Sequence, residues 1–476
     1  MLTLRDVITG LGGKITNSAQ IGAVPITDTV IDSRRVTPGS MFVALPGEQV
    51  DGHDYVAQAF ENGALLVLID HDVDLARPIL DLTAERAVEG CETPACIKVA
   101  NCLQGLQQLA AYWRRRHDAV RVIGVTGSVG KTTTKEQIWT VLRRRYRTLR
   151  SEGNYNNEIG LPLTLLKLNA THERVVLEMG MYTLGEIALL AEIAQPQVGV
   201  VTNVGPTHME RLGSIERIAQ AKSELVVALP ADGVAILNFD DPYVRDMANL
   251  TPARVFSYGL DPAADLWADS IESSGLEGIR LQLHYGDEAI HVRVPLLGRH
   301  SVHTVLRAAA VGLVEGESWD EIAAGLQDSS SHIRLVATPG VNGCTILDDT
   351  YNASPASSIA ALNLIEDLEG RPIAVLGDML ELGTYTDLGH RKVGLRARDV
   401  AAKLITVGTF ARIIAEEALS AGMSAEDVVA VDSNAEAIQA LESIIKAGDI
   451  VLVKGSRGQG MEEIVVALGR PAWPTH

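Results

Sequence analysis

The chain has 476 residues, of which 46% are hydrophobic and 21% are charged, and its formal net charge is −19. This composition excludes an intrinsically disordered protein and indicates packed cores, and the length fits about two to four domains. The negative charge excludes nucleic acid as an expected partner, because a phosphate backbone requires a basic surface. Any phosphate must therefore be held locally, by a loop, a lysine and a metal ion.

The cysteines and the N-terminal residues bear on the cellular compartment. Cys91, Cys96 and Cys102 lie close together, but they form no CxxC pair and have no histidine among them, which argues against zinc. Four cysteines are also too few for a disulfide framework. The first residues lack the basic stretch and apolar core of a signal peptide, and no run approaches ~18 apolar residues. These features predict a cytoplasmic protein without membrane insertion.

The first predicted segment comprises residues 1–118. Short apolar runs at 41–45 and 65–69 predict strands, and Pro38-Gly39 predicts a turn before the first of them. A helical pattern over 103–116 closes the segment. The helix ends in three arginines, which we expect to form a solvated helix end.

The second predicted segment comprises residues 119–328. An apolar strand at 120–125 leads into a glycine loop, and a helix is predicted from about 132 to 145. Helical patterns separate further predicted strands at 174–178, 198–202 and 233–238. This alternation predicts a mostly parallel sheet covered by helices. Residues 266–296 alternate apolar and polar side chains instead, which predicts an antiparallel hairpin.

The third predicted segment comprises residues 329–476. Helical patterns separate its predicted strands, which lie at 345–348, 373–377, 404–408, 428–431 and 450–454. This pattern is typical of a Rossmann-like, doubly wound domain. The chain as a whole is therefore predicted to be α/β, with three domains.

The strongest local motif runs from Gly124 to Thr134 and reads GVTGSVGKTTT. Its glycines let backbone N–H groups approach a phosphate, and the following helix N-terminus adds partial positive charge. Lys131 can bridge the β- and γ-phosphates of a nucleotide, and the Thr132 hydroxyl can bind Mg²⁺. The loop is shorter than GxxxxGK[ST], because Val125 stands five residues before Gly130. A glycine turn without a ligand is the less favoured alternative.

Two further residues end or follow strands of the same predicted sheet. Glu178 ends the strand at 174–178, and His208 follows the strand at 198–202. A single Glu or His is more often an exposed loop residue or a helix cap. Here both are expected at the sheet edge that carries the phosphate loop, which favours magnesium ligands. Lys222 lies on the next predicted helix, where a lysine is usually a solvated charge.

As a set, the motifs resemble the Mur ligase family over nearly the whole chain. Those that carry the resemblance are Asp32-Ser-Arg34, Asp51-Gly-His-Asp54, Gly153–Gly160 (GNYNNEIG), Glu178-Met-Gly180, Asn203–His208, Asp348–Pro355, Leu376–Gly383 and Val453–Arg457. The resemblance implies a UDP-substrate-binding domain at 1–118, a central ATP-binding domain at 119–328 and a C-terminal ligase domain at 329–476.

The same resemblance implies an ATP-dependent carboxylate–amine ligase of peptidoglycan precursor synthesis that forms ADP and phosphate. Its motifs are most similar to those of the family members that add D-alanyl-D-alanine to UDP-N-acetylmuramoyl-tripeptide through an acyl phosphate. The expected cofactors are ATP and Mg²⁺, and a monomer is the expected state. Whether the third peptide residue is lysine or diaminopimelate stays open.

The resemblance also implies residue roles. Catalytic roles fall to Lys131, Lys222, His208 and Glu178. The implied metal ligands are Thr132, Glu178, His208 and Lys222, the last after carbamylation. The implied ATP-binding residues are Gly127, Ser128, Gly130, Lys131, Thr132, Thr133, Asn156, Arg334, Asp349, Tyr351, Asn352 and Asp378. The implied substrate-binding residues are Ser33, Arg34, Asn157 and Glu158.

The chain departs from the family pattern at three positions. Val129 stands where the phosphate loop usually has asparagine, and Ser301 and Thr304 replace both asparagines of the helix after the hairpin. A hydroxyl cannot present the paired donor and acceptor of an amide, so we expect weaker recognition of adenine. Two alternatives remain: another Mur or folylpolyglutamate-type ligase, and a weakly active nucleotide-binding paralogue. The first-segment motifs argue against the former, and the retained Lys131 argues against the latter.

Overall fold

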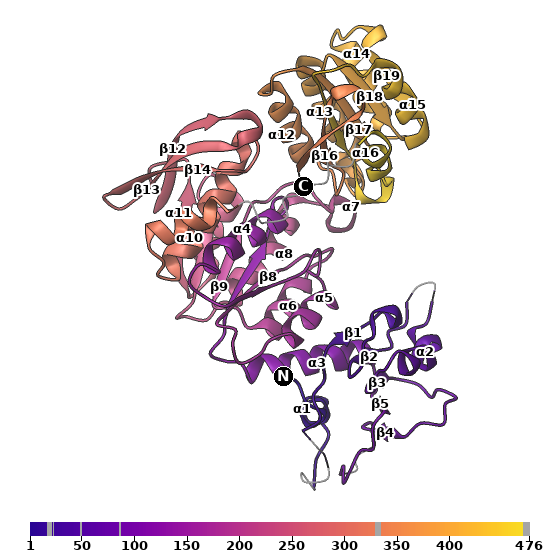
Figure 1. Cartoon of the computed structure of the whole chain (residues 1–476). Coiled ribbons are helices and arrows are strands. Elements are labelled where there is room, and N and C mark those ends of the chain that lie inside the picture. Colours follow the sequence, from indigo (N-terminus) through magenta and orange to yellow (C-terminus); the bar gives the residue numbers. More distant parts are fainter. Residues whose placement is uncertain (17–20, 22, 48–49, 85–86, 329–334, 470–476) are drawn as a thin grey trace, which may run out of the picture.

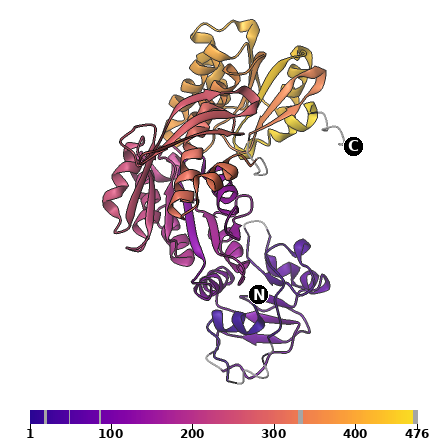
Figure 2. The ribbon, with the colours of Figure 1, turned by 60° about the vertical axis from the view of Figure 1, so that its left-hand side comes forward.

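The structure is a computed structural model, and it describes residues 1–16, 21, 23–47, 50–84, 87–328 and 335–469. Three separate sheets follow one another along the chain, which confirms the predicted α/β class. Figures 1 and 2 both show three lobes, with the N-terminal and C-terminal lobes at opposite ends of the central one. We propose residues 118 and 328 as the approximate domain boundaries.

The N-terminal sheet is parallel and has helices on both faces. Its strands, in spatial order, are β1 (Thr29–Val30), β2 (Met41–Val43), β3 (Leu66–Ile69), β5 (Ala95–Lys98) and β4 (Ile79–Asp81). Met41 and Val43 pack into the core that includes residues of α1 (Leu4–Gly10), whereas Phe42 packs with residues of α2 (Val56–Glu61) on the other face. Because both faces of the sheet are buried in this way, β2 and β3 are continuous apolar runs in the sequence, which explains why they could be predicted. The other three strands were not predicted.

Helix α3 (Cys102–Arg115) joins the N-terminal lobe to the central one. It packs against α5 (Gly160–Leu166) and α6 (Glu186–Ala194), and the Trp113 indole donates to the Leu168 carbonyl over 2.9 Å. The expectation of a solvated helix end is wrong for Arg114, which is 2% exposed and donates from Nε to the Ala194 carbonyl over 2.9 Å. Packing against α6 covers the arginine, and only the tertiary structure supplies that helix.

The central sheet is parallel over most of its width, as predicted. In spatial order its strands are β14 (Glu288–Val294), β13 (Ile279–Tyr285), β12 (Leu266–Ser273), β11 (Arg254–Gly259), β10 (Val234–Asn238), β9 (Val198–Val201), β6 (Arg121–Thr126), β8 (Arg174–Glu178) and β7 (Thr148–Arg150). Strands β12, β13 and β14 pair antiparallel, which confirms the predicted hairpin. The remaining helices of this lobe are α4 (Lys131–Leu142), α7 (Met209–Leu212), α8 (Ile215–Val227), α9 (Pro242–Asp246), α10 (Val302–Val314) and α11 (Trp319–Leu326). Helix α4 packs against α10 and α11.

The C-terminal sheet is doubly wound. Its strands lie in the order β15 (Val336–Pro339), β16 (Thr345–Asp349), β20 (Asp449–Lys454), β17 (Arg371–Gly377), β18 (Lys403–Val407) and β19 (Val428–Val431). The helices are α12 (Pro355–Glu366), α13 (Thr386–Val400), α14 (Ala411–Ser420), α15 (Asn434–Ile444) and α16 (Glu462–Leu468). All five predicted strands are confirmed, whereas the antiparallel edge strand β15 was not predicted. No helix in the described ranges is long and apolar enough to cross a bilayer.

Candidate active site

The loop between β6 and α4 has a backbone shape that only glycine allows at two positions. Gly127 has φ +146°, and a Cβ there would lie 1.8 Å from the Thr202 hydroxyl oxygen. Gly130 has φ +83° and forms the N-cap of α4. The Thr202 hydroxyl donates to the Val129 carbonyl over 2.7 Å, and the Val129 N–H donates to Asn203 Oδ1 over 2.9 Å. The two residues that follow β9 therefore hold the loop through the backbone of residue 129, whatever its side chain.

The first residues of α4 and the end of β8 form one polar cluster. Glu178 is fully buried, and its carboxylate accepts hydrogen bonds from the Thr132 hydroxyl over 2.6 Å and from Asn156 Nδ2 over 2.9 Å. Lys131 Nζ donates to the Gly127 carbonyl over 2.8 Å. Among the described residues, no lysine, arginine or histidine nitrogen lies within 4.0 Å of the Glu178 carboxylate. A buried carboxylate with only neutral protein partners suits a divalent cation.

Lys222 lies on α8 and is 2% exposed. No hydrogen bond or ion pair of its ammonium group is found within the described part of the chain. Burial, and secondarily the charge of Lys131, lower the pKa of Lys222 well below its usual value. Both effects disfavour the charged amine. Lys222 therefore differs from the usual helix lysine, whose charge is solvated.

His208 adopts a left-handed backbone conformation, with φ +57°, between β9 and α7. Its Nδ1 lies 2.7 Å from Oε2 of Glu381, which follows β17. This contact holds the pKa of the Glu381 carboxyl below its ordinary value. The predicted metal ligand is thus connected to the C-terminal lobe in this conformation.

The C-terminal lobe contributes a second polar edge. Lys454, at the end of β20, donates from Nζ to Asp349 Oδ2 over 2.6 Å and to the Asn352 carbonyl over 2.9 Å. The Arg457 guanidinium lies over the Tyr351 ring, 5.4 Å from its centroid. Strands β16 and β20 are parallel neighbours, so their carboxyl ends bring these residues together.

These two edges line one cavity of about 800 Å³. Its lining includes most of the predicted site: Ser128, Gly130, Lys131, Thr133, Asn156, Asn157, Glu158, Glu178, His208, Asp349, Tyr351 and Asn352. The carboxyl edge of a parallel sheet is the usual position of a ligand site in such folds. Two such edges facing one cavity can hold a nucleotide on one side and cover it from the other.

Other predicted residues do not line the cavity. Gly127 and Thr132 lie in its phosphate loop and Lys222 on α8. Asp378 accepts the N–H of Ala411 at the start of α14 over 2.7 Å. Ser33 donates to Gln58 over 2.7 Å, and exposed Arg34 pairs with Asp32 over 2.8 Å. Their roles in binding ATP or UDP remain predictions, and Arg334 lies outside the described residues.

The sequence prediction missed several residues that line this cavity. Lys454 and Arg457 lie in the motif Val453–Arg457, so the signal was present although no role was assigned. Glu381 likewise lies inside Leu376–Gly383. Arg307, on α10, carried no sequence signal, because an arginine in an apolar helix indicates no particular ligand.

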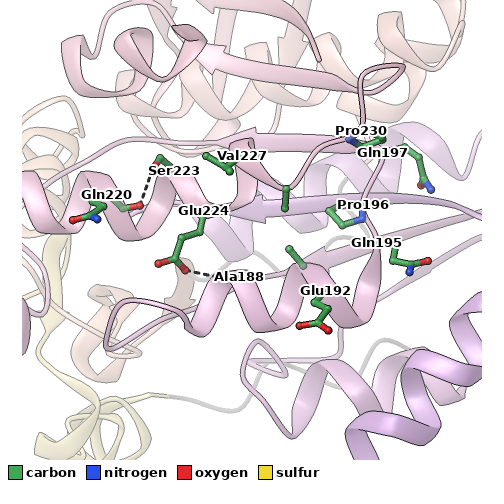
Figure 3. Close-up of a pocket in the computed structure, with 12 residues that line it drawn as sticks. Ala188, Glu192, Gln195, Pro196, Gln197, Gln220, Ser223, Glu224, Val227 and Pro230 are labelled. Carbon is green, nitrogen blue, oxygen red and sulfur yellow. Dashed lines mark hydrogen bonds between the residues drawn. The ribbon is translucent and has the colours of Figure 1, made fainter. Parts of the chain in front are cut away.

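Two features outside this cavity are weaker candidates for a functional site. A hollow of about 690 Å³ lies between α6 and α8, where Figure 3 shows Glu224 hydrogen-bonded to the backbone N–H of Ala188. In the N-terminal lobe, Cys102 lies beside His53 and Asp70, a group that sequence spacing did not reveal. His53 Nε2 already accepts the Asp70 N–H over 3.1 Å, so its lone pair is engaged within the protein.

Comparison with known families and proteins agrees with this geometry. Residues 25–114 match the model of the Mur ligase family catalytic domain, 125–312 the Mur ligase middle domain, and 333–457 the Mur ligase glutamate ligase domain. The UDP-N-acetylmuramoyl-tripeptide–D-alanyl-D-alanine ligase of Bacillus subtilis (strain 168) is 36% identical over 469 residues, covering 97% of each sequence. The likeness therefore extends over all three lobes.

Two solved structures are similar throughout their length. MurF from Acinetobacter baumannii superposes with a TM-score of 0.83 at 30% identity and covers 98% of each chain. The MurF ligase of Thermotoga maritima in complex with ADP has a TM-score of 0.77 at 26% identity, covering 93% of this chain and 97% of the other. The order and arrangement of three α/β domains are thus shared with experimental structures.

Proposed function

The chain belongs to the Mur ligase family, and from this premise we propose that it joins D-alanyl-D-alanine to UDP-N-acetylmuramoyl-tripeptide at the expense of ATP. The observation that carries the substrate assignment is the likeness to the Bacillus subtilis ligase over 97% of both sequences. A relationship confined to the central domain would support ATP use but no particular acceptor, because function depends on the site and not on the fold.

The proposed reaction begins with activation of the substrate carboxylate. A carboxylate oxygen of the tripeptide attacks the γ-phosphorus of ATP, the bond to the β-phosphate oxygen breaks, and ADP leaves. The product is an acyl phosphate. Two anions must approach each other in this step, so positive charge has to be placed beside them. Lys131 and the N-terminus of α4 supply it at the phosphate loop.

A magnesium ion fits the cluster at the end of β8. Thr132 and Glu178 offer hard oxygen atoms that already lie within 2.6 Å of each other, and the Glu178 carboxylate is buried. We propose Thr132, Glu178 and His208 as residues that hold Mg²⁺, which supplies charge neutralisation at the phosphates when bound. His208 would then exchange its contact with Glu381 for the ion.

Lys222 joins this set in a modified form. Its lowered pKa favours the neutral amine, which is the form that adds to carbon dioxide and gives a carbamate. A carbamate is an oxygen anion, so modification would turn a buried amine, which has no partner among the described residues, into a counter-charge for the cation. We propose carbamylation of Lys222 on this ground.

The second step transfers the acyl group. The neutral amine of D-alanyl-D-alanine attacks the acyl carbon, the C–O bond to phosphate breaks, and the nitrogen loses a proton. Water would destroy the acyl phosphate, so the reaction requires a closed cavity. Asp349, Tyr351 and Asn352 face the phosphate loop across the cavity, which suits this role for the C-terminal lobe.

Two further proposals follow from the reaction. We propose a cytoplasmic location, because the reaction uses ATP and a nucleotide-linked substrate. The cavity lining already includes both the phosphate loop and the C-terminal edge, and we propose a monomer as the active form. Light scattering on a gel-filtration column tests the monomer by the mass of the eluted protein.

Phosphate release tests the proposed function. The protein is incubated with Mg²⁺-ATP and UDP-N-acetylmuramoyl-tripeptide, with and without D-alanyl-D-alanine, using both lysine and diaminopimelate forms. We expect release only when both partners are present, together with a product that is heavier by the dipeptide. A folded sample that releases no phosphate with either form would reject the assignment and favour the weakly active paralogue.

A further inference from the structure

A buried arginine lies next to the phosphate loop and has no role in the reaction described so far. Arg307 projects from α10, is 4% exposed and lines the cavity. A Cβ placed on Gly130, the N-cap of α4, would lie 3.3 Å from its Nη2 atom. The guanidinium therefore lies within reach of the place where a phosphate would contact the loop.

The partners of this guanidinium are neutral hydroxyl groups. Its Nε donates to the Thr134 hydroxyl over 2.8 Å, its Nη2 to the Thr304 hydroxyl over 2.9 Å, and its Nη1 to the Tyr258 hydroxyl over 3.5 Å. Burial raises the pKa of Tyr258 to about 12, so this hydroxyl carries no negative charge near neutral pH. Three of the five N–H groups of Arg307 are thus occupied by groups without charge.

Arg307 forms no ion pair with an acidic side chain of the described residues. Within the described ranges, no Asp or Glu oxygen lies within 4.0 Å of its guanidinium. A buried charge normally has a partner of opposite sign, because desolvation without one is strongly unfavourable. The surroundings add to the imbalance, since Thr134 lies in the first turns of α4, where the helix dipole is positive. Lys131 adds a further positive charge at the same helix end.

We propose that Arg307 binds the phosphate chain of the nucleotide, with two of its N–H groups free to donate to phosphate oxygens. This inference rests on the proposed use of ATP and assigns a further nucleotide-binding residue to it. Guanidinium groups suit phosphates, because they present several donors in one plane. Thr134, Thr304 and Tyr258 fix that plane and aim it at the loop.

The assignment also gives Thr304 a function that does not depend on adenine. Its hydroxyl accepts from Arg307 Nη2, and both side chains line the cavity on the α10 side. A side chain that orients the guanidinium contributes to nucleotide affinity indirectly. By this assignment, the charge of Arg307 contributes to nucleotide affinity. Thr304, whose hydroxyl stands where the family has an amide, orients that charge.

Calorimetric titration with ADP and with inorganic tripolyphosphate, both in Mg²⁺ buffer, tests the proposal. We expect Arg307→Met to weaken ADP binding roughly 10-fold to 100-fold, which is the usual range for losing hydrogen bonds to a charged group. Tripolyphosphate, which has no base or sugar, should lose a similar factor. Arg307→Lys keeps the charge without the fork and should fall between wild type and Arg307→Met. Arg254→Met, at an exposed strand end, is the matched control and should bind as wild type does.

The steady-state assay gives a second readout. The KM for ATP should rise by the same factor in Arg307→Met, whereas kcat should stay within about 3-fold of wild type, because the contact holds both ground and transition states. ADP affinity within 2-fold of wild type in folded Arg307→Met would overturn the proposal. Loss of ADP affinity without loss of tripolyphosphate affinity would assign Arg307 to the nucleoside and also overturn it. A wild-type protein that binds no ADP would instead reject the use of ATP.

Discussion

Lys222 in the central lobe and Lys454 in the C-terminal lobe are both 2% exposed, but their surroundings are opposite. Lys454 pairs with Asp349 over 2.6 Å and also donates to the Asn352 carbonyl. Lys222 has no hydrogen-bond or ion-pair partner in the described part of the chain, and its pKa is lowered well below the usual value. The protein therefore supplies a counter-charge to the buried lysine of the C-terminal lobe, whereas the described residues supply none to the equally buried lysine of the central lobe.

The difference extends to the neighbouring groups of each sheet edge. In the central lobe, and among the described residues, the Glu178 carboxylate accepts hydrogen bonds only from neutral groups, and the Arg307 guanidinium donates only to hydroxyl groups, with the Tyr258 ring 5.9 Å away. In the C-terminal lobe, Asp349 has its lysine and Asp378 caps α14. The central edge thus needs charges from outside the protein, which fits a nucleotide with its metal ion. The C-terminal edge holds an ion pair of its own between Lys454 and Asp349, which suits the proposed role of covering the nucleotide.

Substitution at the phosphate loop should produce the largest effect. Lys131→Ala removes the positive charge that offsets the γ-phosphate, so we expect turnover to fall roughly 10³-fold or more. Circular dichroism and the thermal midpoint should remain those of the wild type, because the loop is held by Thr202 and Asn203. Lys392→Ala, on the exposed side of α13, is the control and should keep full activity. Normal ATP-dependent product formation by Lys131→Ala would reject the role of the loop.

The next prediction tests the difference between Lys222 and Lys454. Lys222→Met should reduce kcat roughly 100-fold, because the proposed magnesium site then lacks the oxygen ligand of the proposed carbamate. It should not lower the thermal midpoint, since it removes a buried amine that has no partner among the described residues. The carbamate is first trapped covalently under carbon dioxide. Mass spectrometry of the intact protein should then show the mass of one carbamate on the wild type and none on Lys222→Met. Retained activity in the variant would contradict the metal role.

The opposite pattern is expected at Lys454. Lys454→Met leaves the Asp349 carboxylate without its cation, so we expect the free energy of unfolding to fall by about 2 kcal/mol, less than for a fully buried pair because Asp349 is partly exposed. Urea unfolding measures the loss. Adding Asp349→Asn to the same variant should restore part of the stability, because no unpaired charge then remains. A Lys454→Met protein as stable as wild type would remove the contrast with Lys222.

A smaller effect is expected at a buried group far from the cavity. Glu317 follows α10, is 5% exposed, and neither of its carboxylate oxygens has a hydrogen-bond partner among the described residues. Burial, helped by the neighbouring Glu321, raises the pKa of Glu317 to about 8. The folded protein therefore binds an extra proton between pH 4.5 and about 8. Its contribution to stability is complete below pH 4.5 and is lost as the pH rises through 8.

Glu317→Gln tests this pH dependence. The variant cannot ionise, so it should be more stable than the wild type at pH 9 and should lose this advantage at pH 5. Urea unfolding at the two pH values gives the comparison, and the exposed Glu89→Gln serves as the control. Equal stability differences at both pH values would show that Glu317 is ionised throughout.

The sequence located the phosphate loop and most strands because their signals are local. The loop requires glycine at positions where φ is positive, as at Gly130, and buried parallel strands are continuous apolar runs. The edge strands β4 and β15 escaped prediction, since their partly exposed residues carry no apolar run. Sequence motifs likewise placed Glu178 at the end of a predicted strand and Asp349 directly after one.

Only the tertiary structure decided how charged side chains are partnered. Arg114 reads as a solvated helix end until α6 covers it, and Lys222 reads as a surface lysine until α8 packs against the sheet. The state of a buried charge depends on atoms from distant segments, as with Lys454 and Asp349, which are 105 residues apart. Arg307 shows this most clearly, because its neighbours come from three separate segments of the chain. Sequence motifs identify the chemistry at the loop, whereas the balance of charge around it arises from packing.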